Sequence, residues 1–149
     1  MQISANTRRT KNSKGGLTLG DYQALAGFRH SLRKFQMPGE AAAASAGLMP
    51  QQHQALLAIK ALTDTSQAPS IGEVADCLVI RHHSAVELVG RLFRRGLVKR
   101  NRDPDDRRRV RISLTARAEK KLEALKTAHL DERRAIRSFL VQLLGRFEK

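Results

Sequence analysis

The sequence predicts a mainly α (α+β) fold: a winged helix-turn-helix with N- and C-terminal dimerisation helices. Three observations predict it: a capping motif that opens two short amphipathic helices, an alternating strand behind an arginine-rich loop, and apolar stripes at helical spacing near both ends. With 149 residues the chain is long enough for one domain with a core, and short for two. We therefore expect a single domain at residues 17–149, preceded by a disordered basic arm at 1–16.

Two short helices are predicted within residues 70–96. Ser70 and Glu73 have the spacing of a capping box, in which the serine caps one backbone amide and the glutamate reaches back to another, so a helix begins at Ile71. After a short turn a second helix runs to Gly96. A left-handed conformation at Val79 in this turn would be costly for a β-branched residue. The apolar residues at helical spacing are Ile71, Val74, Ala75 and Leu78, and then Ala85, Leu88, Val89 and Leu92.

Two short amphipathic helices joined by a tight turn form a helix-turn-helix. In this motif the second helix lies in the major groove of DNA, and its N-terminal residues contact base edges. The residues at these positions are Arg81, His82, His83, Ser84 and Glu87, with Arg91 one turn further on.

A β-hairpin is predicted directly after the second helix. Residues 110–114 alternate between apolar side chains and Arg111 or Ser113, which indicates a half-buried strand with one apolar and one basic face. Residues 97–100 form the partner strand, so 101–109 become the hairpin loop. Such a projecting basic loop is suited to a phosphate backbone or a narrow minor groove, and a solvated charged loop is the alternative. The tip carries Arg107, Arg108 and Arg109.

These residues resemble the multiple antibiotic resistance regulator (MarR) family of winged helix-turn-helix transcription factors. The family's signature is an aspartate, one residue, an arginine, five residues and then Leu-Thr. The resemblance extends over about residues 18–147 of this chain. The signature is matched here by Asp106, Arg108, Leu114 and Thr115.

The resemblance implies a homodimer with a winged helix-turn-helix at about residues 50–115 and dimerisation helices at about 18–37 and 116–148. It implies that Arg108 enters the minor groove and that Asp106 holds it in place. It also implies a ligand-responsive repressor, in which a small aromatic or phenolic effector binds between the dimerisation helices and the winged domain.

The charge of the chain agrees with nucleic-acid binding. The formal net charge is +14, and residues 81–111 hold eleven Lys and Arg against four Asp and Glu, which leaves +7 on that segment. Five Phe and one Tyr provide no aromatic platform for single strands, so duplex DNA is the expected partner. Two alternatives remain: a non-specific architectural or nucleoid DNA-binding protein, and a regulator that acts through protein contacts.

Apolar stripes near both ends predict a homodimer. One lies in the helix that Thr18 opens, and the other in the last helix, which follows a helix opened by Thr115 and ending near His129. If these helices pair with their copies, two recognition helices lie about 34 Å apart and the operator is an inverted repeat. The stripes are Leu25, Phe28, Leu32 and Phe35, and Ile136, Phe139, Leu140, Leu143, Leu144 and Phe147.

No pattern in the sequence indicates an enzyme, a cofactor or a metal site. The five histidines are scattered, and neighbouring His82 and His83 point in different directions on a helix. Cys77 is the single cysteine, so an intramolecular disulfide is excluded; we expect a small semi-buried residue, with peroxide sensing as the alternative.

The first residues of the chain also bear on its location. No continuous apolar stretch follows their basic residues, and no run of about 18 apolar residues occurs, so neither a signal peptide nor a membrane span is predicted. We expect a cytosolic or nucleoid-bound protein. The basic arm either adds phosphate contacts or is a solvated tail.

Overall fold

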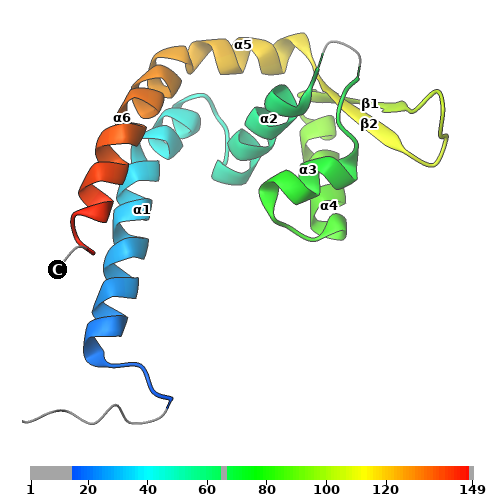
Figure 1. Cartoon of the computed structure of the whole chain (residues 1–149). Helices are drawn as coiled ribbons and strands as arrows, with labels where there is room; N and C mark the ends of the chain where they lie inside the picture. Colours follow the sequence, from blue (N-terminus) through cyan, green and yellow to red (C-terminus); the bar gives the residue numbers. More distant parts are fainter. Residues whose placement is uncertain (1–14, 65–66, 148–149) are drawn as a thin grey trace, which may run out of the picture.

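The computed structural model describes residues 15–64 and 67–147, and the predicted basic arm lies almost wholly outside them. Figure 1 shows α2, α3, α4 and the hairpin gathered on one side, while α1 and α6 run alongside each other and α5 crosses between the two groups. We call α2, α3, α4, β1 and β2 the winged unit, and α1 with α6 the arm. This arm is separate from the basic arm predicted at residues 1–16. The elements are α1 (Leu19–Ser45), α2 (Pro50–Leu62), α3 (Ile71–Leu78), α4 (His82–Arg94), β1 (Val98–Arg102), β2 (Val110–Leu114), α5 (Ala116–Ala124) and α6 (Lys126–Leu144). This order confirms the predicted mainly α, winged helix-turn-helix fold.

The core lies inside the winged unit. The apolar positions that the helical spacing singled out in α4 are all buried, and they pack with residues of α2 and β2. Ala118, Leu122 and Leu125 close this core from α5 and the residue after it. The largest completely buried side chains are Leu56, Ile59, Val74, Val89, Leu92, Leu97 and Ile112.

The start of α3 and the turn after it follow the prediction with one difference. The Ser70 hydroxyl accepts a hydrogen bond from the Glu73 amide at 3.2 Å, as in a capping box. The Glu73 carboxylate, however, accepts from the Ser70 hydroxyl at 3.2 Å, and not from the backbone amide that was predicted. Val79 has φ 55° and ψ 45°, so this exposed β-branched residue occupies the left-handed region.

The hairpin is longer than predicted, because β1 continues through two residues of the expected loop. Asn101 pairs with Arg111, and Arg102 with Val110, so the loop is reduced to residues 103–109. On its other edge β2 is held by the Ile112 amide, which donates to the carbonyl of Pro69 at 2.8 Å. The wing is therefore fastened to the chain just before α3.

The helices at the two ends differ from the predicted limits. Thr18 caps α1 through a capping box with Asp21, but α1 continues past residue 37 to Ser45 with Pro38 inside it. Proline removes one backbone donor, and the helix-favouring alanines that follow, of which Ala43 is completely buried, offset that loss. At the other end Thr115 caps α5, which stops at Ala124 and not near His129.

Within the described residues, no helix is long and apolar enough to cross a membrane.

Candidate nucleic-acid interface

The N-terminal part of α4 presents the predicted base-reading residues to solvent. Arg81 is the N-cap residue, and His82 and His83 form the first positions of the helix; all three are exposed. Ser84 is half-buried, because it stands next to the core residue Ala85. One and two turns further on, Glu87 and Arg91 are exposed on the same side of the helix.

The wing tip presents its three arginines in the same way. Arg107, Arg108 and Arg109 are all exposed. The Asp106 carboxylate accepts a hydrogen bond from the backbone amide of Arg108 at 3.0 Å, and its carbonyl accepts from the Arg109 amide at 3.0 Å. Asp106 thus fixes the turn from which the Arg108 guanidinium projects, through backbone contacts.

The structure brings the recognition helix and the wing together beside the start of α3. A hollow of about 240 Å³ is lined by His82 from α4, by Arg108 and Arg109 from the wing, and by Ser70 and the two residues that follow it. His82 is 12 positions from Ser70 and 26 positions from Arg108 in sequence, yet the three segments line one hollow. A helix start adds backbone N–H groups that favour a negatively charged group in this place.

A second recess lies between α4 and β1 and contains two arginines that were not singled out from the sequence. Arg94 and Arg100 line a recess of about 490 Å³ together with Glu87, Gly90 and Arg91. The Arg100 guanidinium lies over the ring of Phe93, 4.0 Å from its centroid, which restricts its orientation. The charge of the segment was evident in the sequence, but the convergence of these two residues depends on how β1 packs against α4.

The wing is anchored by an ion pair that turns Arg111 inward. The Arg111 guanidinium donates to the Asp103 carboxylate at 2.7 Å and 2.9 Å, and to the carbonyl of Ala68 at 2.9 Å. It also lies 3.5 Å from Glu73. The prediction that Arg111 contributes to an outward basic face is therefore wrong: its side chain is only 13% exposed, because these oxygen atoms surround it.

Asp103 joins this anchor to the loop itself. Its carboxylate also accepts hydrogen bonds from the backbone amides of Asp105 at 2.8 Å and Asp106 at 3.3 Å. The amide of Asp105 and then the Arg111 guanidinium lower the pKa of the Asp103 carboxyl below its ordinary value. The first aspartate of the loop, and not only the one in the family signature, therefore shapes the wing.

Comparison with known proteins identifies this arrangement. A sequence profile of the MarR family matches residues 46–109, which include α2, α3, α4, β1 and the wing loop. Over these residues the chain is similar to the MarR family. No curated protein matches this chain.

Three solved structures have a similar fold. A probable transcriptional regulator from Pseudomonas aeruginosa is 27% identical, with 80% of this chain and 92% of that one covered and a TM-score of 0.57. BpsR of Bordetella bronchiseptica, whose DNA binding is regulated by 6-hydroxynicotinic acid, is 21% identical, with 85% and 99% covered and a TM-score of 0.63. A mutant MarR from E. coli in complex with operator DNA is 16% identical, with 89% and 100% covered and a TM-score of 0.67.

The chain has a groove at the place where the resemblance implied an effector. It lies between α2 of the winged unit and α5 and α6, with a volume of about 380 Å³. Leu57, Leu122 and Leu130 supply its apolar surface. The charged and polar residues that line it are Lys60, Glu119, Glu123, Lys126, His129 and Arg133.

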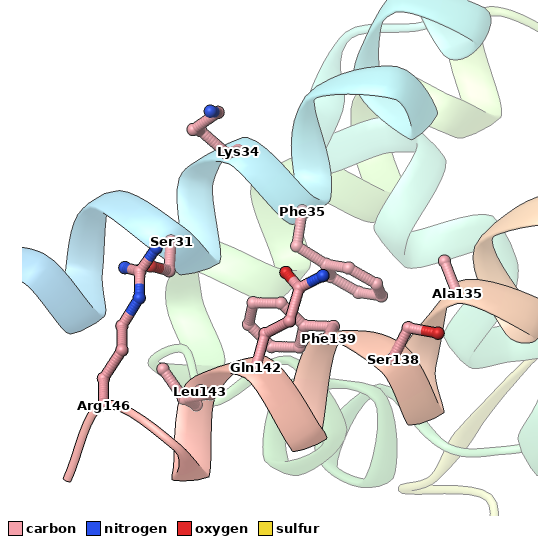
Figure 2. Close-up of a pocket in the computed structure, with 9 residues that line it drawn as sticks. All are labelled: Ser31, Lys34, Phe35, Ala135, Ser138, Phe139, Gln142, Leu143 and Arg146. Carbon is pink, nitrogen blue, oxygen red and sulfur yellow. The ribbon is translucent and has the colours of Figure 1, made fainter.

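Another groove, of about 310 Å³, lies between the two helices of the arm (Figure 2). Phe35 and Phe139 stack across it with ring centroids 4.5 Å apart, and Arg146 donates to the Ser31 hydroxyl at 2.6 Å. Figure 2 shows these side chains between the two helices. The contacts hold α1 and α6 of one chain together.

Two expectations about chemically reactive side chains were wrong. Cys77 is exposed on α3, and not semi-buried. The histidines are not all scattered, since His53 and His129 form a hydrogen bond. Among the described residues no group of three or more His, Cys, Asp or Glu is arranged to hold a metal ion.

Proposed function

We propose that this chain is a MarR-type transcriptional regulator that binds an inverted repeat in duplex DNA as a homodimer. The observation that carries the proposal is the shared surface of α4 and the wing, where His82 lies beside Arg108 and Arg109. With α4 in the major groove, Arg81, His83 and Glu87 reach base edges and the wing reaches the adjacent minor groove. Ser84 and Arg91 then lie closest to the sugar-phosphate backbone.

The recess between α4 and β1 fits this placement. A helix in the major groove and a hairpin tip in the next minor groove must have one phosphate strand between them. Arg94 and Arg100 line the recess between α4 and β1, the strand that leads to the hairpin tip. We assign them, with Arg107 and Arg109, to phosphate contacts, which supply affinity and its dependence on salt.

The arm supports the homodimer. No residue of α6 is buried within a single chain. Phe35 and Phe139 use one side of the arm to join α1 to α6, and a second apolar side remains uncovered. Burial of this side against its copy gives a two-fold interface, and it places the two recognition helices about 34 Å apart. The exposed apolar residues are Leu25, Phe28, Ile136, Leu140, Leu144 and Phe147.

Selection of duplexes from a random pool by the purified protein, at physiological salt, tests the proposal. We expect enrichment of one inverted repeat, bound about 10³-fold or more tightly than random duplex. A variant with Arg107, Arg108 and Arg109 all changed to alanine is the control for wing-dependent binding. Strong binding without enrichment would support the non-specific architectural function in its place.

A specific observation also favours an effector site in the groove between α2, α5 and α6. Three basic residues, Lys60, Lys126 and Arg133, face the groove against two acidic ones, beside an apolar surface of leucines. This combination suits a small aromatic carboxylate, because the leucines can cover its ring and the basic residues can bind its carboxylate. The groove joins the winged unit to the arm, so a ligand that prefers one spacing of the recognition helices would shift DNA affinity.

Calorimetric titration with a panel of aromatic carboxylates, with and without the selected operator, tests this site. We expect binding that weakens in an Arg133→Ala variant and that lowers operator affinity. Arg137→Ala, at an exposed position of α6 outside the groove, is the matched control. Equal ligand affinity in both variants would place the site elsewhere.

A further inference from the structure

Two histidines from distant parts of the chain form a hydrogen bond between the winged unit and the arm. His53 lies in α2 and is 6% exposed, and His129 lies in α6 and is half-buried. Their Nε2 atoms are 2.8 Å apart. The two rings are also parallel, with an interplanar angle of 5° and centroids 5.1 Å apart.

The pair lies where α6 meets the winged unit. Helix α6 packs chiefly against α1 and α5. Among the described residues, no other hydrogen bond, ion pair or ring contact joins α6 to α2, α3, α4 or the wing. The pair is therefore the direct polar link between α6 and the winged unit, whose position relative to the arm sets the spacing of the recognition helices.

The chemistry of the link allows only certain protonation states. In a neutral pair, one Nε2 carries the proton that is shared and the other Nε2 accepts it. One further proton can be added to the Nδ1 of the donor ring, and the bond persists. A second further proton must be added to the accepting Nε2, which leaves two N–H groups facing each other and breaks the bond.

The surroundings oppose the charged states. The groove beside His129 contains Lys60, Lys126 and Arg133 as well as Glu119 and Glu123. The two carboxylates already pair with lysines, at 3.0 Å for Lys60 and 3.7 Å for Lys126, so the groove has a net positive charge. Glu132 of α6 is directed toward Gly39 of α1, on the side where α1 and α6 pack together.

Burial adds to this effect. Desolvation lowers the pKa of His53, and the positive charge of a protonated His129 lowers it further. An unfolded chain takes up this proton at its ordinary pKa of about 6.5. The neutral pair therefore contributes its full stability above that pH, and the contribution falls as the pH decreases below it.

We propose that the hydrogen bond between His53 and His129 is an acid-sensitive latch, which fixes the winged unit against α6 at neutral pH and opens when both imidazoles are protonated. Opening frees the winged unit to move relative to the arm. In the dimer this widens the range of spacings between the two recognition helices, and it weakens binding to an operator of fixed half-site spacing. The consequence for DNA rests on the proposed function, but the latch itself does not.

NMR of the ¹⁵N-labelled imidazoles, without DNA, tests the latch directly. At about pH 7.5 we expect one protonated and one unprotonated Nε2 within the pair, and coupled titration in two steps as the pH falls. Independent single-step titration of His53 and His129 would overturn the proposal, and this result does not depend on dimerisation or on DNA binding.

The mechanical consequence can be measured with the protein's own cysteine. Cys77 is the single cysteine and is exposed on the winged unit, so one spin label per chain reports the distance between the two winged units of a dimer. For the wild-type protein we expect a narrow distance distribution at about pH 7.5 that broadens at about pH 5. An unchanged distribution would overturn the latch. A missing dipolar signal would contradict the proposed homodimer and leave the imidazole titration to decide the latch.

Three variants separate the latch from other effects of acid. His129→Leu removes the hydrogen bond, so we expect the broad distribution at both pH values. His129→Gln keeps a side chain that can donate or accept, so the distribution should remain narrow at both. His83→Leu is the control, because it removes an exposed imidazole of α4 that lies outside the pair, and it should behave like the wild type. If His129→Gln broadened with acid as the wild type does, another group would be responsible.

Discussion

The winged unit and the arm differ in how far a single chain buries their apolar side chains. In the winged unit, three helices and a hairpin bury their apolar side chains against one another, down to complete burial of Leu92 and Ile112. In the arm, α6 buries none of its residues, and Leu140 and Leu144 remain 48% and 62% exposed. The winged unit is thus complete within one chain, whereas the arm is complete only when a second apolar surface covers it.

The largest expected effect is a change of oligomeric state caused by substitutions in the arm. A double change, Leu140→Glu and Leu144→Glu, places unpaired charges in the proposed interface, and each costs several kcal/mol to bury. We expect the dissociation constant of the dimer to rise at least about 1000-fold, as measured by sedimentation equilibrium. Ala61→Glu, at an exposed position of α2, should leave the dimer unchanged. A dimer that survived the double change would require another interface.

Leucine-to-alanine changes in the two regions should differ sharply in the free energy of unfolding. Leu92→Ala removes a completely buried side chain and should cost about 2–5 kcal/mol. Leu144→Ala should cost less than about 1 kcal/mol in the monomer, because the side chain is already exposed there. Urea denaturation at several protein concentrations measures both, and the cost of Leu144→Ala should rise as the dimer forms. Equal costs at low concentration would show that the arm is not an open surface.

Within the winged unit, the wing combines a contact residue with an anchor residue. Arg108→Ala should weaken operator binding by about 1–3 kcal/mol and leave the melting temperature unchanged, because the exposed side chain supports nothing else. Arg111→Ala should lower both affinity and melting temperature, since it leaves the Asp103 carboxylate without its ion pair. Titration of operator DNA and thermal unfolding distinguish the two. If Arg108→Ala bound DNA as the wild type does, the wing tip would be a solvated loop.

The turn between α3 and α4 should become more stable when its strain is removed. Val79 is 89% exposed and left-handed, so Val79→Gly loses no packing and relieves a backbone cost of about 1–3 kcal/mol. The greater freedom of glycine in the unfolded chain offsets part of this gain, so we expect a net gain of about 1 kcal/mol in urea denaturation. Ala24→Gly, within α1, should have the opposite sign. A less stable Val79→Gly protein would mean that the side chain makes a contact in the dimer.

The smallest effect concerns the pH dependence of the wing anchor. Because folding lowers the pKa of Asp103, its contribution is fully present above the ordinary value of 3.8 and is lost as the pH falls through the lower, folded value. The difference in unfolding free energy between wild type and Asp103→Asn should therefore be larger at about pH 6 than at about pH 3. Asp21, whose pKa is also lowered, contributes equally to both proteins and cancels from the difference. A difference that is constant with pH would show that the anchor does not depend on the charge of Asp103.

Most of the local structure, and the outline of the site, could be predicted from sequence. Hydrogen bonds of Ser70, Thr115 and Thr18 to amides three residues away open their helices where the motifs indicated. The period of two in residues 110–114 placed β2, and the helical period placed the buried face of α4. Such features depend on residues a few positions apart, and a linear pattern contains them in full.

Other features depended on which surfaces meet in three dimensions. Arg111 was expected on a basic face because its neighbours alternate, but its partners include the carbonyl of Ala68, 43 residues earlier. His129 meets His53 across 76 positions, and no spacing rule connects them. Composition and periodicity therefore determined the class of fold, the helix starts and the basic wing. Packing of distant elements decided that Arg111 anchors the wing, that Cys77 is exposed and that His53 meets His129. These features form only after the core has brought the elements together.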